Sequence, residues 1–162
     1  MLVNVDQIGV DSTTVNDFFN QISIVSPRAN INMETNLYTK EEKLLLTMRP
    51  GITDLSSIIF SDEGNILEYS DNPNLDYNQL IRPWKRRLGI LYVDNRSLLI
   101  DVKLIFLTAV AVISKQKALK SINKILLKLG ADEKIISICL RQSKLELLPH
   151  PGSSEVIVSR NQ

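Results

Sequence analysis

The sequence has few of the residues that form disulfides and metal centres, since one of its 162 residues is cysteine and one is histidine. A single cysteine excludes an internal disulfide, and one Cys with one His cannot supply a zinc ligand cluster. Cys139 lies between Ile138 and Leu140, so we expect it to be a small buried hydrophobe. His150 lies between two prolines in a polar stretch, so we expect it to be solvated, and no Ser-His-Asp set is predicted.

The sequence also lacks a long uninterrupted apolar run. A membrane-spanning helix needs about 20 apolar residues, and the best candidate, residues 98–113, is interrupted by Asp101 and Lys103. The first ten residues show no basic segment followed by an apolar one, so no signal peptide is expected. We therefore expect a soluble or membrane-surface protein on the cytoplasmic side.

Strong charge of one sign is absent as well. The formal net charge is +1, and aromatic residues make up 6% of the chain. No known DNA- or RNA-binding motif is present, so nucleic acid is not expected as a partner. The apolar fraction of 44% and the charged fraction of 23% are ordinary for a globular domain and exclude wholesale disorder.

The periodicity predicts a mostly α-helical fold, at most α+β with a short strand or hairpin. Thr39 and Glu42 have the spacing of a capping box before an apolar run. Apolar residues three and four positions apart predict a helix from about Leu80 to Tyr92. Further helices are expected over 98–114 after a Ser97 cap, over 117–129 before Gly130, and over 133–142 after an Asp132 cap.

The remaining segments are predicted less sharply. A short helix is expected over 15–20 and a short strand over 22–24, whereas 53–60 suits either type. Residues 61–65 read as a turn or loop. We expect one domain over 1–148, made of a core over 12–114 and a helical extension over 115–148, followed by a flexible tail over 149–162.

A basic cluster occupies the helix predicted around Trp84. Four cations fall within six residues, namely Arg82, Lys85, Arg86 and Arg87. Arginine matches phosphate geometry, so one interpretation is a site for phosphate, diphosphate or anionic headgroups. The alternative is a solvated helix face balanced by nearby acids.

The segment from Leu98 to Lys128 combines an apolar first half with a lysine-rich second half. Such a pair is typical of an interfacial amphipathic helix on an anionic membrane surface. The alternative is a core helix followed by a surface helix. The lysines assigned to the membrane surface are Lys115, Lys117, Lys120 and Lys124.

Two further arginines, Arg28 and Arg49, stand beside turn-forming prolines that could aim them into a cleft. Paired carboxylates for catalysis are not predicted. Glu41-Glu42 is better explained by helix capping, and Asp62-Glu63 lies in the predicted turn. The sequence therefore offers no catalytic residue and no metal ligand.

Four blocks of the chain resemble the bacterial sugar-transferase family, the monotopic polyprenyl-phosphate phosphoglycosyl transferases. Residues 22–28 resemble the block "MSLVGPRP", and residues 37–43 with 48–54 resemble "LYTxEEK…VRPGITG". Residues 92–108 resemble "YYVxNxSLxLDLKIxxLT", and residues 78–85 match a helix entry found in one branch. The blocks occur in the family's order, from about residue 12 to residue 114.

The resemblance implies transfer of hexose-1-phosphate from a nucleotide sugar to polyprenyl phosphate in glycan or exopolysaccharide biosynthesis. It also implies Mg²⁺ as cofactor and an Asp-Glu pair whose Asp carries the phosphosugar covalently. Nucleotide sugar, polyprenyl phosphate and an anionic membrane are the implied partners. The implied location is the cytoplasmic face of the bacterial inner membrane, as a peripheral protein, or the cytoplasm.

The chain departs from the family where the Asp-Glu pair is expected, because residues 13–21 contain no such pair. Ala29 replaces a proline of the "PRP" motif, and Gly89 replaces an acid. We therefore expect a truncated or degenerate, catalytically incomplete member, with Arg28 and Arg49 facing the former active site. The alternative is a non-catalytic helical module that binds a membrane surface or a partner.

Overall fold

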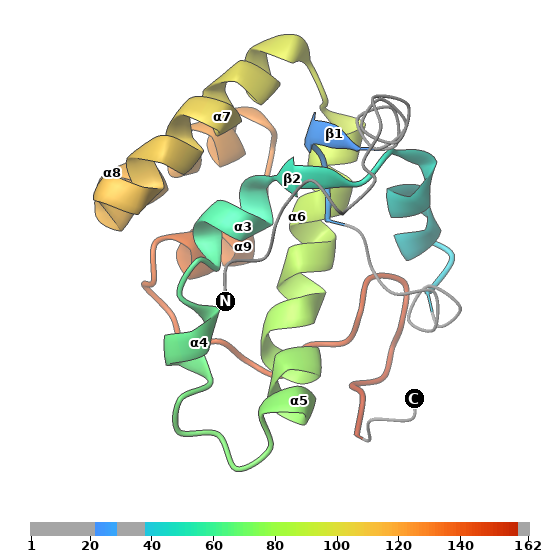
Figure 1. Cartoon of the computed structure of the whole chain (residues 1–162). Helices are drawn as coiled ribbons and strands as arrows, with labels where there is room; N and C mark the ends of the chain where they lie inside the picture. Colours follow the sequence, from blue (N-terminus) through green and yellow to red (C-terminus); the bar gives the residue numbers. More distant parts are fainter. Residues whose placement is uncertain (1–21, 29–37, 159–162) are drawn as a thin grey trace, which may run out of the picture.

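A computed structural model of the chain describes residues 22–28 and 38–158 (Figure 1). Helices dominate this part, with one small parallel sheet, so the predicted mostly helical fold is confirmed. The elements, in chain order, are β1 (Ser23–Val25), η2 (Glu42–Thr47), β2 (Gly51–Thr53), α3 (Leu55–Ile59), α4 (Glu63–Ile66), α5 (Pro73–Asp76), η3 (Tyr77–Ile81), α6 (Arg82–Asp94), α7 (Leu98–Ile113), α8 (Lys115–Lys128) and α9 (Glu133–Cys139). The helix predicted over 15–20 lies outside the described residues.

Helix α6 runs through the centre of the fold (Figure 1). Pro83 is the second residue of α6 and directly follows the π-helical turn η3, and the carbonyl of Gln79, four residues earlier, accepts instead from the N–H of Leu148 (3.2 Å). Trp84, Leu88 and Tyr92 follow at four-residue intervals and are all buried. This side of α6 packs against α3 and leaves another side for the basic residues.

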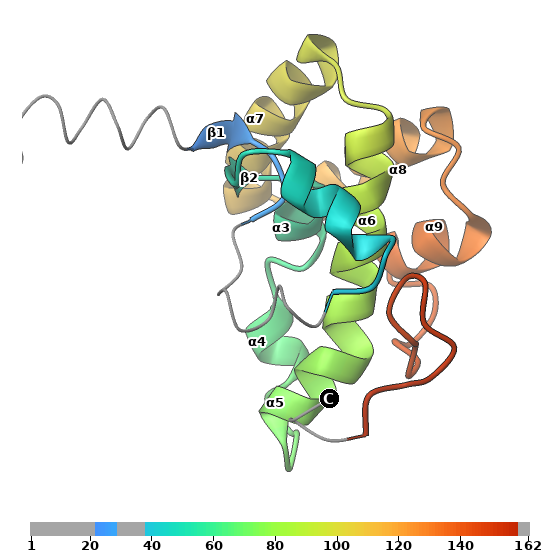
Figure 2. The same ribbon diagram turned by 90° about the vertical axis from the view of Figure 1, so that its right-hand side faces the viewer.

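The helical hairpin α7–α8 follows its predicted caps. The Ser97 side chain accepts a hydrogen bond from the backbone N–H of Ile100 at the start of α7. Gly130 follows α8 with a φ of +72°, which a residue without Cβ adopts freely. Figure 2 shows the hairpin beside the upper part of α6. No helix among the described residues has the length and apolarity to traverse a bilayer.

The third predicted cap is also present, since the Asp132 carboxylate accepts from the N–H of Ile135 at the start of α9. Cys139 at the end of α9 is fully buried, as expected, and burial raises the pKa of its thiol to about 11. The loop predicted over 61–65 is wrong, because α4 begins at Glu63. The start of α4 is fixed by ion pairs of Asp62 with Lys115 and Arg141, which no local sequence pattern reveals.

The two strands pair in parallel, with Ser23 opposite Gly51 and Val25 opposite Thr53. A Cβ at position 51 would lie 2.3 Å from backbone atoms of Ser26, so only glycine allows this approach. Directly after β2, the Asp54 side chain and the Ser57 side chain form a reciprocal capping box that starts α3. The ambiguous segment 53–60 is therefore the end of a strand followed by a helix.

The expectation that His150 is solvated is wrong. Its exposed fraction is 9%, and its Nδ1 lies 2.7 Å from Oε1 of Glu42. Its neighbours are tied down too, since Arg87 donates to the carbonyl of Pro149 and Thr39 to that of Pro151. Composition suggested a solvated histidine, but a buried carboxylate 108 positions away provides its partner.

Candidate anion-binding site

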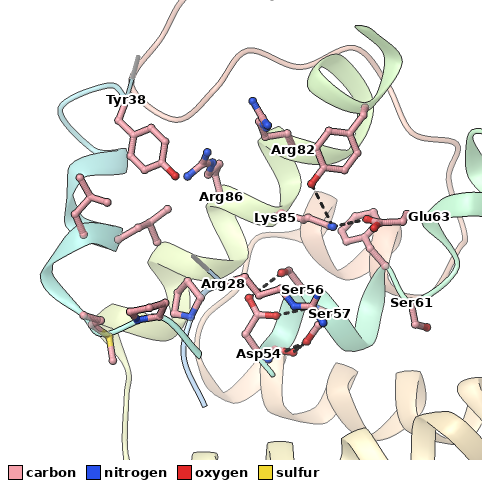
Figure 3. A pocket seen from close by; sticks show the side chains of 17 residues that line it. Arg28, Tyr38, Asp54, Ser56, Ser57, Ser61, Glu63, Arg82, Lys85 and Arg86 are labelled. Atoms are coloured by element: carbon pink, nitrogen blue, oxygen red, sulfur yellow. Dashed lines mark hydrogen bonds and ion pairs between the residues drawn. The ribbon is translucent and has the colours of Figure 1, made fainter. Parts of the chain in front are cut away.

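A cavity of about 800 Å³ lies between the residues that follow β1 (Pro27 and Arg28), η2, α3, α4, η3 and α6. Figure 3 shows Tyr38 and Arg86 at one side, Lys85 and Glu63 at the other, and Asp54, Ser56 and Ser57 near Arg28. Its size suits a ligand with several chemical groups. Its polar or charged lining consists of Arg28, Tyr38, Asp54, Ser56, Ser57, Ser61, Glu63, Tyr77, Arg82, Lys85 and Arg86.

Helix α6 contributes three cations to this cavity. Arg82, Lys85 and Arg86 stand at positions i, i+3 and i+4, which share one face of a helix. Arg87 lies on a different face, where it donates to the carbonyls of Pro83 and Pro149. The basic cluster is thus divided. Arg82, Lys85 and Arg86 line the cavity, whereas Arg87 contacts Pro149 in the C-terminal segment.

Arg86 is the most deeply placed of these cations, with an exposed fraction of 5%. Its guanidinium carbon lies 3.9 Å from the ring centroid of Tyr38, and its Nε lies 3.6 Å from Oε1 of Glu42. Stacking on an aromatic ring and a carboxylate partner together fix a guanidinium plane. Arg86 is therefore pre-oriented at the wall of the cavity.

Glu42 is almost fully buried, and its carboxylate holds Arg86. It accepts hydrogen bonds from Nδ1 of His150 (2.7 Å) and from the backbone N–H of Thr39 (3.0 Å). Burial acts to raise the pKa of Glu42. The two hydrogen bonds and the positive charges of His150 and Arg86 outweigh burial, so the pKa is lowered overall. The capping box predicted for Thr39 and Glu42 is confirmed, but this second role was missed.

Lys85 lies at the opposite side of the cavity, in an ion pair with Glu63. Its Nζ donates to the hydroxyl of Tyr77 (3.4 Å), and its ammonium and the Arg82 guanidinium lie 5.1 and 5.4 Å from the Tyr77 ring centroid. Both cations therefore lie within cation–π distance of the same ring.

The third side of the cavity is the start of α3. The Asp54 carboxylate accepts from the hydroxyl of Ser56 (2.7 Å) and from the N–H of Ser57 (2.7 Å). Arg28, at the end of the β1 segment, is exposed and forms no ion pair with an acid among residues 22–28 and 38–158. Asp54 is therefore engaged in capping, whereas Arg28 is available to a ligand.

The charge balance of the lining favours an anion. Four cationic side chains, Arg28, Arg82, Lys85 and Arg86, line the cavity with two carboxylates, those of Asp54 and Glu63, and the Glu42 carboxylate lies against Arg86. Both carboxylates have partners, and the described residues contain no group of three His, Cys, Asp or Glu side chains that could hold a metal ion. Because Asp54 is engaged with Ser56 and Ser57 and Glu63 with Lys85, no chemical step is derived through the Mg²⁺ that the resemblance implies.

The predicted cations do not all meet. Arg28 lines the same cavity as Arg82, Lys85 and Arg86, although it lies far from them in the sequence. Arg49 is exposed and is not part of that lining, while its neighbours Met48 and Pro50 are. Tyr38, Ser56 and Ser57 were not singled out from the sequence, because nothing local marks them.

The lysines expected at a membrane surface also separate. Lys117, Lys120 and Lys124 are exposed on α8, whereas Lys115 forms an ion pair with Asp62. Helix α7 exposes an apolar face, whose members recur at three- and four-residue spacings. They are Leu98, Leu99, Val102, Ile105, Phe106, Val112 and Ile113. Their contact with a membrane stays a prediction.

Comparison with known proteins gives a result at the level of the family. A model of the family described as bacterial sugar transferase matches residues 15–115, which is more than half of the chain. No curated protein and no solved structure matches. The matched range contains the whole lining of the cavity, and it agrees with the order of the four sequence blocks. The chain belongs to the bacterial sugar transferase family.

Proposed function

We propose that the cavity beside α6 binds the phosphate groups of a nucleotide sugar. The observation that carries this proposal is the convergence of four cationic side chains on one space, in which the Asp54 and Glu63 carboxylates are already engaged by other groups. A diphosphate carries charges that such a set complements, and guanidinium groups bind phosphate oxygens in pairs. The remaining volume has room for the non-phosphate parts of the ligand.

The pre-orientation of Arg86 supports the same proposal. A binding group that is already held in place loses little conformational freedom when the ligand arrives. Arg86 is stacked on Tyr38 and held by Glu42 before any ligand binds. Arg28 provides a contrast, because it is exposed and would order itself only on the ligand.

In the family reaction, hexose-1-phosphate passes to polyprenyl phosphate, and we propose that this chain serves that reaction without a complete catalytic pair. An attacking carboxylate needs an unobstructed oxygen facing the phosphorus. Asp54 spends its oxygens on Ser56 and Ser57, and Glu63 is paired with Lys85. Neither acid of the described lining is placed as a nucleophile, and Mg²⁺ remains an expectation from the resemblance.

The exposed face of α7 supports a second part of the proposal, peripheral attachment to the cytoplasmic face of the membrane. An apolar helix face in the interface plane, with lysines nearby, binds anionic bilayers. Phe106 and Val112 have exposed fractions of 68% and 86%, which is unusual for large apolar side chains on one helix. A chain that bound membranes but no phosphate ligand would be the alternative, a non-catalytic surface module.

Calorimetric titration tests the phosphate site. We expect a uridine diphosphate hexose and inorganic pyrophosphate to bind the wild-type chain, and uridine alone to bind far more weakly. Equal binding of uridine and of the diphosphates would contradict a phosphate site. Isotope transfer from the nucleotide sugar to polyprenyl phosphate tests completeness, and sustained turnover would contradict the incomplete assignment.

A further inference from the structure

The C-terminal segment, residues 148–157, crosses the same helix that carries the cavity's cations, although it lies beyond the family match. Figure 2 shows this red segment beside the lower part of α6. The N–H of Leu148 donates to the carbonyl of Gln79 (3.2 Å), and the Gln79 side chain donates to the carbonyl of Ile157 (2.5 Å). Arg87 and Thr39 hold the carbonyls of Pro149 and Pro151 between these two points.

A tight turn in the middle of this segment directs His150. The N–H of Ser153 donates to the carbonyl of His150 (3.0 Å), and Gly152 has a φ of +74°. Proline followed by a glycine of positive φ is the combination that a type II turn requires. A Cβ at Gly152 would also lie 3.2 Å from side-chain atoms of Glu41 and Thr39. The turn thus presses against the start of η2, where Glu42 lies.

One carboxylate oxygen joins this segment to the cavity. Oε1 of Glu42 lies 2.7 Å from Nδ1 of His150 and 3.6 Å from Nε of Arg86. The other oxygen accepts from the N–H of Thr39. Glu42 is 2% exposed, so its position depends on these partners rather than on water. His150 and Arg86 share the Oε1 oxygen of Glu42, so a displacement of His150 would alter the contact between Glu42 and Arg86.

We propose that His150 is a positioning residue for the phosphate cavity. Through Glu42 it keeps the Arg86 guanidinium stacked on Tyr38, so the affinity for phosphate depends on a segment outside the family-matched region. This inference rests on the proposed function of the cavity. His150 does not line that cavity. It lines a smaller one of about 220 Å³ that shares Tyr38, Arg82 and Arg86 with it, and its effect on a ligand in the larger cavity passes through Glu42 and Arg86.

Substitutions at His150 test the inference with inorganic pyrophosphate as the probe. We expect His150→Ala to lower the affinity about five- to tenfold, as loss of a buried charge-assisted contact implies. We expect His150→Gln, whose amide can still donate to Glu42, to retain most of the affinity. Gln79→Ala is the matched control, because it releases the same segment from η3 at another bond and should leave affinity unchanged.

A double-mutant cycle separates positioning from a general structural role. In an Arg86→Ala background, His150→Ala should cause no further loss, because the group that it positions is gone. Glu42→Gln, which keeps the shape of the side chain, is the second route if His150→Ala does not fold, and it should weaken pyrophosphate binding by a similar factor.

The outcomes distinguish the two proposals. Pyrophosphate binding that is the same in wild type, His150→Ala and Glu42→Gln would overturn the role of His150 and leave the cavity proposal standing. Losses that add fully in the Arg86→Ala background would also overturn it. A wild-type chain that binds no pyrophosphate would overturn the proposed function itself.

Discussion

The cation-lined cavity and the exposed face of α7 come from neighbouring helices, yet their surroundings differ. Around the cavity, segments far apart in sequence enclose α6, and its charged groups are held by Tyr38, Glu42 and Glu63. On α7, only one side is covered, and Phe106 remains 68% exposed. The polar groups of the cavity are thus pre-organised within the chain, whereas the apolar face of α7 is uncovered among the described residues. The two surfaces should therefore respond to different substitutions.

The largest expected effect is a loss of pyrophosphate affinity caused by a substitution in the cavity. Arg86→Ala should lower the affinity for pyrophosphate about 10- to 100-fold, because charge-assisted hydrogen bonds contribute about 1.5–3 kcal/mol each. The affinity of Arg86→Lys should lie between those of the wild type and Arg86→Ala, since a point charge cannot reproduce the guanidinium geometry. Calorimetric titration gives the affinities.

A control variant tests whether the loss in Arg86→Ala is specific to the cavity. Arg96→Ala is a matched control, since Arg96 is exposed just beyond the end of α6 and outside the cavity lining. It should bind pyrophosphate like the wild type. A loss of pyrophosphate binding in Arg96→Ala that equalled the loss in Arg86→Ala would point to general charge attraction instead of a built site.

The next effect concerns α7. Phe106→Asp should reduce partition onto anionic liposomes about tenfold or more, because burying an aromatic side chain contributes about 1.5–3 kcal/mol. Pyrophosphate affinity should not change. Gln142→Asp is the control for charge, since residue 142 is exposed beyond α9. Equal co-sedimentation of both variants would remove the membrane part of the proposal.

A moderate effect is expected at Tyr92, which joins α6 to α7 and β1. Tyr92 of α6 donates to the carboxylate of Asp101 in α7 (2.7 Å) and lies 3.2 Å from the carbonyl of Val25 in β1. Burial and the carboxylate raise the pKa of its phenol. Tyr92→Phe should lower the free energy of unfolding by about 1–2 kcal/mol. Urea unfolding measures it.

Binding data for the same variant test whether Tyr92 is purely structural. Pyrophosphate affinity and liposome partition of Tyr92→Phe should both match the wild type when measured well below the unfolding transition. A selective loss of one of them would mean that the contact with α7 tunes a surface as well as the fold.

The smallest expected effect is a pH dependence. The folded-state pKa of Glu42 lies below its usual 4.5. A carboxylate with a lowered folded pKa contributes stability above the unfolded pKa, and that stability is lost as pH falls through the folded pKa. Glu42→Gln should therefore be less stable than wild type near pH 7, and the difference should shrink below about pH 4.5. Unfolding curves of unchanged separation from pH 7 to pH 3 would contradict this account.

The parts of the fold that sequence could predict depend on local chemistry. Ser97 and Asp132 cap helices because a side-chain oxygen needs only the N–H three residues ahead. Gly130 follows α8 because positive φ favours glycine. These features repeat wherever the local pattern occurs, so the helix starts of α7 and α9 agree with prediction.

The parts that sequence could not predict depend on distant partners. Arg86 and Arg87 look alike in the sequence, yet one lines the cavity and the other binds the carbonyl of Pro149. Asp62 looks like a turn residue, but Lys115 and Arg141 fix it at the start of α4. The cation cluster could be recognised from composition, whereas its division between two surfaces required the tertiary contacts.

Chemical-shift mapping of the ¹⁵N-labelled chain with a uridine diphosphate hexose tests the central claim most directly. The account predicts saturable shifts at the backbone amides of residues 56–60, 82 and 84–86, with little change along α7 and α8, and loss of these shifts in Arg86→Ala. Saturable shifts confined to α7 and α8, or unchanged shifts in Arg86→Ala, would contradict a phosphate site beside α6.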